Sequence, residues 1–391
     1  MDPHSDRSWR FWLHSWTFLE PVLLAAAEGD TEALELGVRI AVDWVENNVR
    51  GAEGISEFAW YDMAVGARAA CLGFLARVTS LDGHFAEEHS TLLRSAVEHG
   101  EWLAADGNYV QAHNHGLYED AGLALLCMQL PEMPLAGAWY RKARARFVQN
   151  VSATVQMGEG FHLEHSPAYH VMILELIKRM AAAARFDDSE IERTVRKMRE
   201  RTPWLVLPDG RYAQFGDTDL EAGPEWLDGI APPEGLLFAR STGLAAVAAG
   251  DERLLAVSWY HLRGHKHSDE LSFVWFLEDH RFLVDAGRYG YYYTEPGRKY
   301  AESSRAHNVL TRADMEFTFR GQKPYGSGLS GAGEIEGWTV IVGHNPLLAP
   351  QGLQHRRAWI YRPGTCLFVC DFVDNQAPER PEIRRRFHVG P

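Results

Sequence analysis

Residues 263–287 read RGHKHSDELSFVWFLEDHRFLVDAG, and this stretch indicates how the second half of the chain folds. Residues 271–277 and 282–285 are apolar runs typical of strands, and a polar four-residue turn separates them. Two histidines, His265 and His267, stand in front of the first strand. On a strand, their spacing points both side chains to one face, as metal ligands or catalytic bases require. The stretch therefore predicts a β-hairpin that carries functional histidines where it begins.

Other short β-rich runs occur beyond residue 235. Turn residues separate them, as in an antiparallel sandwich. They are RLLAVSWY (253–260), WTVIVG (338–343), RRAWIYR (356–362) and TCLFVCDFV (365–373). The final segment, RRRFHVGP, reaches Pro391 in strand-like sequence without a closing turn. We therefore expect a sandwich that is incomplete at its C-terminus.

From Trp9 to about Arg201 the pattern is helical. Apolar residues recur every three or four positions, for example in TEALELGVRIAVDWVENNV, and Asp30 and residues 187–189 stand where helix N-caps are expected. We expect about eight helices joined by short loops, with no strand among them. Consecutive helices without heptads indicate an incomplete (α/α) toroid or a solenoid rather than a four-helix bundle.

Prolines and glycines in residues 219–235 mark the change between the two patterns and read as a linker. We therefore predict a multidomain α+β protein. Its toroid domain would cover residues 1–225, and its antiparallel β-sandwich domain residues 226–391. The 391 residues are enough for two such domains.

The composition excludes some classes of function. A net charge of −14 argues against a nucleic-acid partner, because such proteins need a basic face. The four cysteines have no CxxC spacing and read as free or buried thiols. The N-terminal stretch has neither the basic and apolar regions of a signal peptide nor an unbroken membrane span. We expect no membrane association, and a cytoplasmic protein, or an exported one whose leader was removed.

The first candidate site is Asn114–His115–Gly116, within QAHNHGLYED (residues 111–120). We place it in a loop between two helices. The amide and the imidazole can donate hydrogen bonds to a carboxylate, and the glycine lets the backbone come close. The plainer alternative is a helix N-cap with an exposed histidine, which the tripeptide alone favours slightly.

The second candidate site is GEGFHLEHSPAYH, residues 158–170. Ser166 and Pro167 read as the N-cap and first residue of a helix, so Tyr169 and His170 fall in its first turn. The helix dipole favours a phenolate there, which suits a tyrosine that exchanges protons. A tyrosine packed in the core is an equally good interpretation.

The third candidate site combines His267, Asp285 and His307, the last of these from SSRAHNVL. Two imidazoles and one carboxylate from adjacent strands suit Zn²⁺. Alternatively, Asp285 forms an ordinary salt bridge with Arg281. The tyrosine-rich loop of residues 285–300, DAGRYGYYYTEPGRKY, is typical of sugar sites, where rings stack and hydroxyls hydrogen-bond. Its alternative role is to pack on the helical half.

Taken in order, these motifs resemble one family. Over about residues 9–391, the chain is similar to the heparinase II/III-like polysaccharide lyases. The similarity lies in a helical half with Asn-His-Gly, followed by EHSPAYH, HKHSDELSF, LVDAGRYGY and SSRAHNVL. The resemblance implies an incomplete toroid followed by an antiparallel β-sandwich. It also implies an active site in the cleft between them, which His265 and His267 would face.

The resemblance implies β-elimination at a glycosidic bond 4-linked to a uronic acid. Asn114 and His115 would neutralise the uronate carboxylate, so that the C5 proton becomes acidic. Tyr169 would protonate the leaving O4, or act as both acid and base for one C5 epimer. His265 would be the base for the other epimer.

The resemblance also implies a structural zinc ion, bound by His267, Asp285 and His307. Its assisting tyrosine would be Tyr289 or Tyr293. We further expect three residues of these motifs to contact the acidic saccharide, namely Glu164, His170 and Arg305. The chain could also form a homo-oligomer.

Basic and acidic residues balance between residues 263 and 305, so no basic channel for a heavily sulfated chain is evident. This balance favours a weakly charged uronan, such as alginate, hyaluronan, unsulfated heparosan or a capsule polymer. Two rival functions are open. A toroid-fold glycoside hydrolase would pair Glu119 or Asp120 with Asp217 or Asp219, and a carbohydrate-binding protein would bind without turnover.

Overall fold

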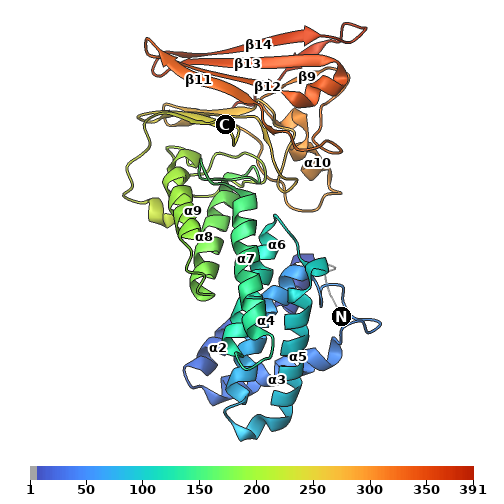
Figure 1. Cartoon of the computed structure of the whole chain (residues 1–391). Helices are drawn as coiled ribbons and strands as arrows, with labels where there is room; N and C mark the ends of the chain where they lie inside the picture. The colour runs from blue at the N-terminus through green and yellow to red at the C-terminus, as the bar shows by residue number, and fades with distance from the viewer. Residues whose placement is uncertain (1–6) are drawn as a thin grey trace. The chain divides into compact units, whose positions relative to one another are not determined.

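The structure, a computed structural model, describes residues 7–391. These residues form two compact units (Figure 1). Unit 1 contains the described residues up to Thr154 together with Leu176–Glu192, and unit 2 contains Val155–Glu175 together with Arg193–Pro391. The predicted boundary between residues 225 and 226 lies inside unit 2, shortly before its first long strand.

Helices dominate the described chain up to residue 201, as the periodicity predicts. The α-helices are α1 (Arg7–Ser15), α2 (Glu20–Ala27), α3 (Thr31–Asn47), α4 (Asp62–Thr79), α5 (Ala86–Ala104), α6 (Asn114–Gln129), α7 (Ala136–Thr154), α8 (Pro167–Ala183) and α9 (Ser189–Arg201). The expectation of no strand among them is wrong, because β1 (Val155–Gln156) and β2 (Phe161–His162) pair antiparallel.

Local capping explains where several of these helices begin. The Asp30 carboxylate accepts a hydrogen bond from the Ala33 amide at 3.0 Å, and Asp188 accepts one from Glu190 at 2.9 Å, so both predicted caps are confirmed. Helix α4 packs on α5 and α6, and α6 packs on α7. A Cβ atom at Gly122 would overlap the Gly66 carbonyl, so α4 and α6 approach this closely only with glycine there.

Two antiparallel sheets in unit 2 form the predicted sandwich (Figure 1). The five-stranded sheet has the order β3 (Gly235–Ala239), β4 (Leu244–Ala249), β5 (Glu252–Val257), β7 (Phe273–Leu277), β8 (His280–Leu283). The four-stranded sheet has the order β11 (Leu329–Ile335), β12 (Trp338–Asn345), β13 (Leu353–Arg362), β14 (Cys366–Asn375). Short ladders join β6 (Trp259–Tyr260) to β10 (Gly326–Ser327) and β9 (Leu310–Arg312) to β15 (Ile383–Arg385), and α10 covers Pro296–Glu302.

Strand alternation places different residues on the two faces of the five-stranded sheet. Leu254 and Phe273 pack against Trp359 of the other sheet, which fills the sandwich core. Leu255, on the opposite face of β5, packs with Phe215 in a second core. The stretch around Phe215 is thereby held against the sheet, and its neighbours carry much of the candidate site.

The hairpin exists, but its limits differ from the predicted ones. Its turn is only Glu278 and Asp279, both with positive φ (49° and 62°), because a two-residue turn of this kind matches strand twist. His265 and His267 lie in a turn and an irregular segment before β7, and His265 has a φ of 56°. The prediction that they share one face of a strand is therefore wrong.

Within residues 7–391, no single helix is long and apolar enough to cross a membrane. Two helical segments that meet at a 115° bend, Asp62–Thr79 and Gly83–Ala104, are long and apolar enough for a bent span only when taken together. Cys71, Cys127, Cys366 and Cys370 are free thiols, as the spacing predicts.

Candidate active site

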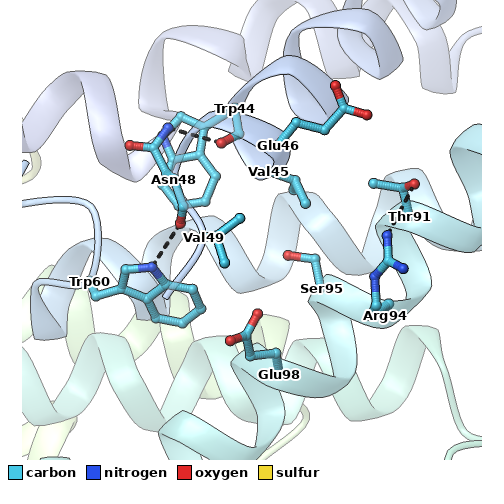
Figure 2. Close-up of a pocket in the computed structure, with 10 residues that line it drawn as sticks. All are labelled: Trp44, Val45, Glu46, Asn48, Val49, Trp60, Thr91, Arg94, Ser95 and Glu98. Atoms are coloured by element: carbon cyan, nitrogen blue, oxygen red, sulfur yellow. Dashed lines mark hydrogen bonds between the residues drawn. The ribbon is translucent and has the colours of Figure 1, made fainter. Parts of the chain in front are cut away.

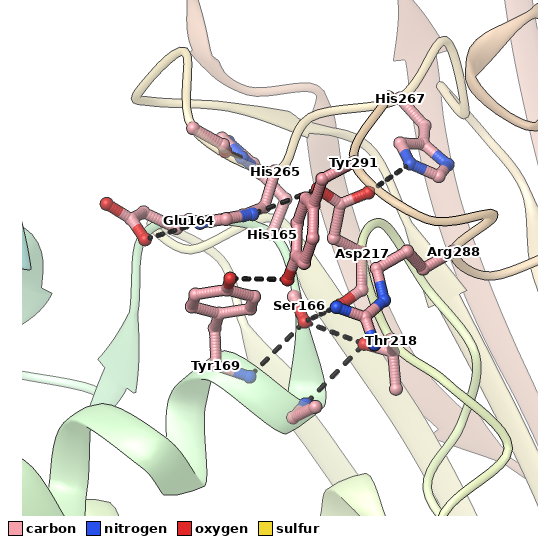
Figure 3. A network of polar contacts seen from close by, with 12 residues as sticks. Glu164, His165, Ser166, Tyr169, Asp217, Thr218, His265, His267, Arg288 and Tyr291 are labelled. Atoms are coloured by element: carbon pink, nitrogen blue, oxygen red, sulfur yellow. Dashed lines mark hydrogen bonds and ion pairs between the residues drawn. The ribbon is translucent and has the colours of Figure 1, made fainter. Parts of the chain in front are cut away.

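The candidate site in unit 2 gathers side chains from the start of α8, from residues 216–219 and from the segment before β7 (Figure 3). Helix α8 begins at Pro167, and the Ser166 hydroxyl accepts a hydrogen bond from the Tyr169 amide at 3.3 Å. Both observations confirm the predicted N-cap. Tyr169 therefore sits in the first turn of α8.

Tyr169 and His265 lie against each other. Their ring centroids are 3.4 Å apart with 23° between the ring planes, and the Tyr169 hydroxyl hydrogen-bonds to the Tyr291 hydroxyl at 2.7 Å (Figure 3). Burial, and then the bond to Tyr291, raise the pKa of Tyr169 well above that of a free tyrosine. Tyr169 therefore holds its proton at neutral pH, which suits a proton donor.

His265 lies between two carboxylates. Its Nδ1 is 2.9 Å from Asp217 Oδ2, and its Nε2 is 3.4 Å from Glu164 Oε2. An ionised carboxylate can only accept a hydrogen bond, so Nδ1 of His265 carries the proton and donates it to Asp217 as a hydrogen bond. Gly264 leaves room for Glu164, since a Cβ atom there would lie 3.2 Å from the Glu164 carboxyl carbon.

Asp217 is the most connected residue of the site. Its carboxylate also accepts from His267 Nε2 at 2.9 Å and from both terminal nitrogens of Arg298, one of them at 3.0 Å. Burial would raise the pKa of Asp217, but the hydrogen bonds from His265, His267 and Arg298 hold it far below the usual range. Asp217 is therefore a fixed negative charge.

The three predicted metal ligands are near one another, without surrounding a common point. His307 Nδ1 is 2.9 Å from Asp285 Oδ1, Ser272 donates to Asp285 Oδ2 at 2.7 Å, and the rings of His267 and His307 are 5.4 Å apart. Among residues 7–391, no group of three or more His, Cys, Asp or Glu is arranged to hold a metal. Buried Nδ1 of His267 and Nε2 of His307 nevertheless have no hydrogen-bond partner in this part of the chain.

The predicted substrate-binding residues have different environments. Tyr289 and Tyr293 are about half exposed, and neither is the tyrosine that contacts Tyr169. Arg305 is half exposed and pairs with Glu316 at 2.6 Å. His170 is buried, and its ring accepts from the His162 amide and contacts the Met198 carbonyl, so it braces α8 and does not face open space.

Asn114 and His115 belong to unit 1. They form the first turn of α6 and do not lie in a loop, because the His113 ring caps the helix by accepting from the His115 amide at 3.2 Å. His115 Nδ1 pairs with Asp62 at 3.0 Å. The buried Oδ1 of Asn114 has no hydrogen-bond partner within residues 7–391.

Three residues of the site were not expected there: Asp217, Arg298 and Tyr291. The sequence suggests Asp217 only as a carboxylate of the rival hydrolase, although its stretch FGDTD has two aspartates within three residues. The sequence predicts a tyrosine-rich loop typical of sugar sites, but it has no feature that distinguishes Tyr291 from its neighbours. Nothing local to Arg298 marks it, since it acts on a residue far away in the chain.

The pocket shown in Figure 2 has a volume of about 440 Å³ and lies in unit 1. Trp44 and Trp60 line it, and the Trp60 indole donates to the Asn48 carbonyl at 3.0 Å. None of the predicted site residues borders this pocket. It does not bear on the predicted chemistry.

Two family models match the chain along almost its whole length. The heparinase II/III N-terminus model covers residues 1–229, and the heparinase II/III-like C-terminal model covers residues 231–391. The chain therefore belongs to the heparinase II/III family. A comparison with curated proteins found no match.

Solved structures share its fold. A heparinase III gene product matches with a TM-score of 0.73 and 18% identity over 96% of this chain and 66% of that one. Heparan sulfate lyase HepC from Pedobacter heparinus matches with a TM-score of 0.68 and 19% identity, over 96% of this chain and 64% of that one. Another heparinase III matches with a TM-score of 0.74 and 17% identity, over 93% of this chain and 63% of that one. The predicted fold class, a toroid followed by an antiparallel β-sandwich, is confirmed. This chain spans about two thirds of the length of these structures.

Proposed function

We propose that this chain is a polysaccharide lyase that cleaves a uronic-acid-containing polysaccharide by β-elimination. Family membership supports the class of enzyme. The observation that carries the chemistry is the stacked pair Tyr169 and His265, in which the tyrosine keeps its proton and the histidine has one nitrogen fixed by Asp217.

In the proposed reaction, a base takes the C5 proton, the C4=C5 double bond forms, the C4–O4 bond breaks, and O4 receives a proton. Tyr169 supplies that proton. His265 takes the C5 proton at Nε2, since Asp217 occupies its Nδ1. Glu164, on the Nε2 side, would then stabilise the imidazolium that forms.

The C5 proton becomes acidic only when the uronate carboxylate is neutralised. We assign this role to Asn114 and His115. The amide of Asn114 lies at a helix N-terminus, where the dipole adds attraction for a carboxylate. The amide nitrogen of the Asn114 side chain is the donor from which a uronate carboxylate would accept.

We also propose a structural Zn²⁺ held by His267, Asp285 and His307. The two buried imidazole nitrogens without partners fit a metal that prefers nitrogen ligands. Asp285 now pairs with His307, and burial opposes charge on both, although their attraction raises the pKa of His307 and lowers that of Asp285. Zinc would brace the segment that carries His265 and would take no part in the elimination.

Two observations support the proposed substrate class, namely the family and the local charge. Solved relatives carry the names heparinase III and heparan sulfate lyase, which supports an acidic polysaccharide here. The balanced charge between residues 263 and 305 favours a weakly sulfated or unsulfated uronan. We expect cleavage of heparosan, alginate or hyaluronan before heparin.

The test is a panel of these uronans, with heparan sulfate and heparin included, followed by ultraviolet absorbance of the unsaturated product. A lyase produces the C4=C5 chromophore, whereas a hydrolase gives reducing ends without it. Asp217 is a poor hydrolytic acid, because its pKa is held far below normal. Reducing ends without absorbance, or binding without products, would overturn the proposal.

A further inference from the structure

Three consecutive residues, Asp217, Thr218 and Asp219, each contact a different part of the candidate site. Figure 3 shows the first two of them. None belongs to the motifs through which the sequence resembles its family. Their backbone is tied to the site on both sides. The Asp217 amide donates to the His265 carbonyl at 3.3 Å, and the Arg288 amide donates to the Thr218 carbonyl at 3.2 Å.

A tight backbone approach places this segment. Gly216 has a φ of 51°, and a Cβ atom there would lie 2.5 Å from the His165 carbonyl oxygen and 2.6 Å from that of His265. Only glycine fits here, because any Cβ atom would overlap both carbonyl oxygens. The segment that starts at Asp217 therefore runs between the two chain segments that supply the proposed acid and base.

The first contact orients the proposed base. Asp217 accepts from His265 Nδ1 at 2.9 Å, and Arg298 holds the same carboxylate while its Nε bonds to Glu302 at 2.7 Å. Both Asp217 and Arg298 are buried. This chain of bonds fixes the tautomer and the ring plane of His265.

The second contact supports the helix that carries the proposed acid. The Thr218 hydroxyl hydrogen-bonds to the Ser166 hydroxyl at 2.7 Å. Ser166 in turn caps α8 at the Tyr169 amide, so Thr218 fixes the start of the helix.

The third contact reaches the hydroxyl of that acid. Asp219 accepts from Arg288 Nε at 3.0 Å and from its Nη2. The Arg288 guanidinium lies over the Tyr291 ring, 4.5 Å from its centroid, and Tyr291 bonds to the Tyr169 hydroxyl. Asp219 thus positions Tyr291 and, through it, the Tyr169 hydroxyl.

We propose that residues 217–219 form a positioning segment that aligns His265 and Tyr169 with each other. Asp217 orients the histidine, Thr218 the helix start, and Asp219 the tyrosine hydroxyl. None of the three touches the reacting atoms. The proposal rests on the proposed lyase function for its kinetic consequences, but its contacts can also be tested without turnover.

The kinetic test compares Asp217→Asn, Thr218→Val and Asp219→Asn with wild type on a uronan that wild type cleaves. We expect kcat to fall by about 10- to 100-fold, as for other residues that orient a functional group, with KM nearly unchanged. Asp209→Asn is the matched control, because it removes an ion pair with Arg281 in the same unit that involves no residue of the site. If substitution of the buried Asp217 prevents folding, the variant of the partly exposed Asp219 still tests the proposal.

Double variants separate positioning from a merely structural role. If Asp217 acts through His265, Asp217→Asn should cost little further kcat once His265→Ala is present. Likewise, Asp219→Asn should add little to Tyr291→Phe. Additive losses in both pairs, or normal kcat in all three single variants, would overturn the proposal.

A readout independent of turnover distinguishes failure of this proposal from failure of the lyase assignment. In histidine-labelled protein, the ring ¹⁵N resonances of His265, assigned with His265→Gln, should show a protonated, hydrogen-bonded Nδ1. Asp217→Asn should shift them, while Asp209→Asn should not. If wild type cleaves no uronan, the function is wrong; unchanged His265 resonances in Asp217→Asn would refute the positioning role itself.

Discussion

The hydroxyl group of Tyr169 is the part of this residue that would donate a proton, whereas its ring only packs on His265. Tyr169→Phe keeps the ring stack on His265 and removes the bond to Tyr291. We expect the variant to fold and its kcat on a uronan to fall about 100-fold or more, because O4 loses its proton source. Steady-state kinetics with circular dichroism as the folding control test this, and near-normal kcat would show that Tyr169 is not the acid.

Asn114 should show a different kinetic pattern. If Asn114 neutralises the uronate carboxylate as proposed, its hydrogen bond should strengthen as negative charge moves onto that carboxylate in the transition state. Asn114→Ala should therefore lower kcat more than it raises KM. The measurement is kcat and KM on the same uronan, and a rise in KM alone would make Asn114 a binding residue only.

At the scale of elements, strands β13 and β14 are joined by a buried charge cluster as well as by their backbone ladder. Asp371 of β14 accepts from Arg357 at 2.7 Å and from His355 at 2.8 Å, both of β13. Burial would raise the pKa of Asp371, but these two partners lower it well below the usual value. The ionised carboxylate therefore favours the folded state.

We predict that Asp371→Asn destabilises the fold by roughly 3 kcal/mol, because the buried Arg357 loses its counter-ion. Because the pKa of Asp371 is depressed in the folded state, its carboxylate contributes fully to stability above the unfolded-state pKa, near pH 4. That contribution is lost progressively as the pH falls from there toward the lower folded-state pKa. Urea unfolding at neutral and acidic pH should show the two proteins converging on acidification. Glu382→Gln, which removes an exposed pair with Arg384, should behave like wild type at every pH.

At the scale of the whole molecule, a bound metal would connect the site to overall stability. If zinc binds only the folded protein, a chelator should lower the melting temperature of wild type. His267→Ala should melt at a lower temperature and should not respond to chelator. Elemental analysis that finds no stoichiometric zinc, with melting unchanged by chelator, would leave His307 and Asp285 as a buried ion pair.

The sequence by itself determined most of the helices and long strands and their order, although it missed the short strands β1 and β2. Helix caps such as Asp30 and Ser166, and the short β-rich runs of β7 and β12 to β14, depend on residues within a few positions, so local patterns predict them. The motifs around Tyr169 and His265 were likewise readable from their neighbours.

Only the tertiary structure decided how the site is assembled. Tyr169 meets Tyr291 across 122 positions of sequence, and Asp217 meets Arg298 across 81. Tyr291, and neither Tyr289 nor Tyr293, contacts Tyr169 because of how distant segments pack. The same holds for Asp217 as the partner of His265. The start of α6 at Asn114 also depended on a contact 37 positions away, where the Asn150 side chain accepts from the His113 amide. Local sequence cannot predict such contacts, because it is the packing of the core that brings their two sides together.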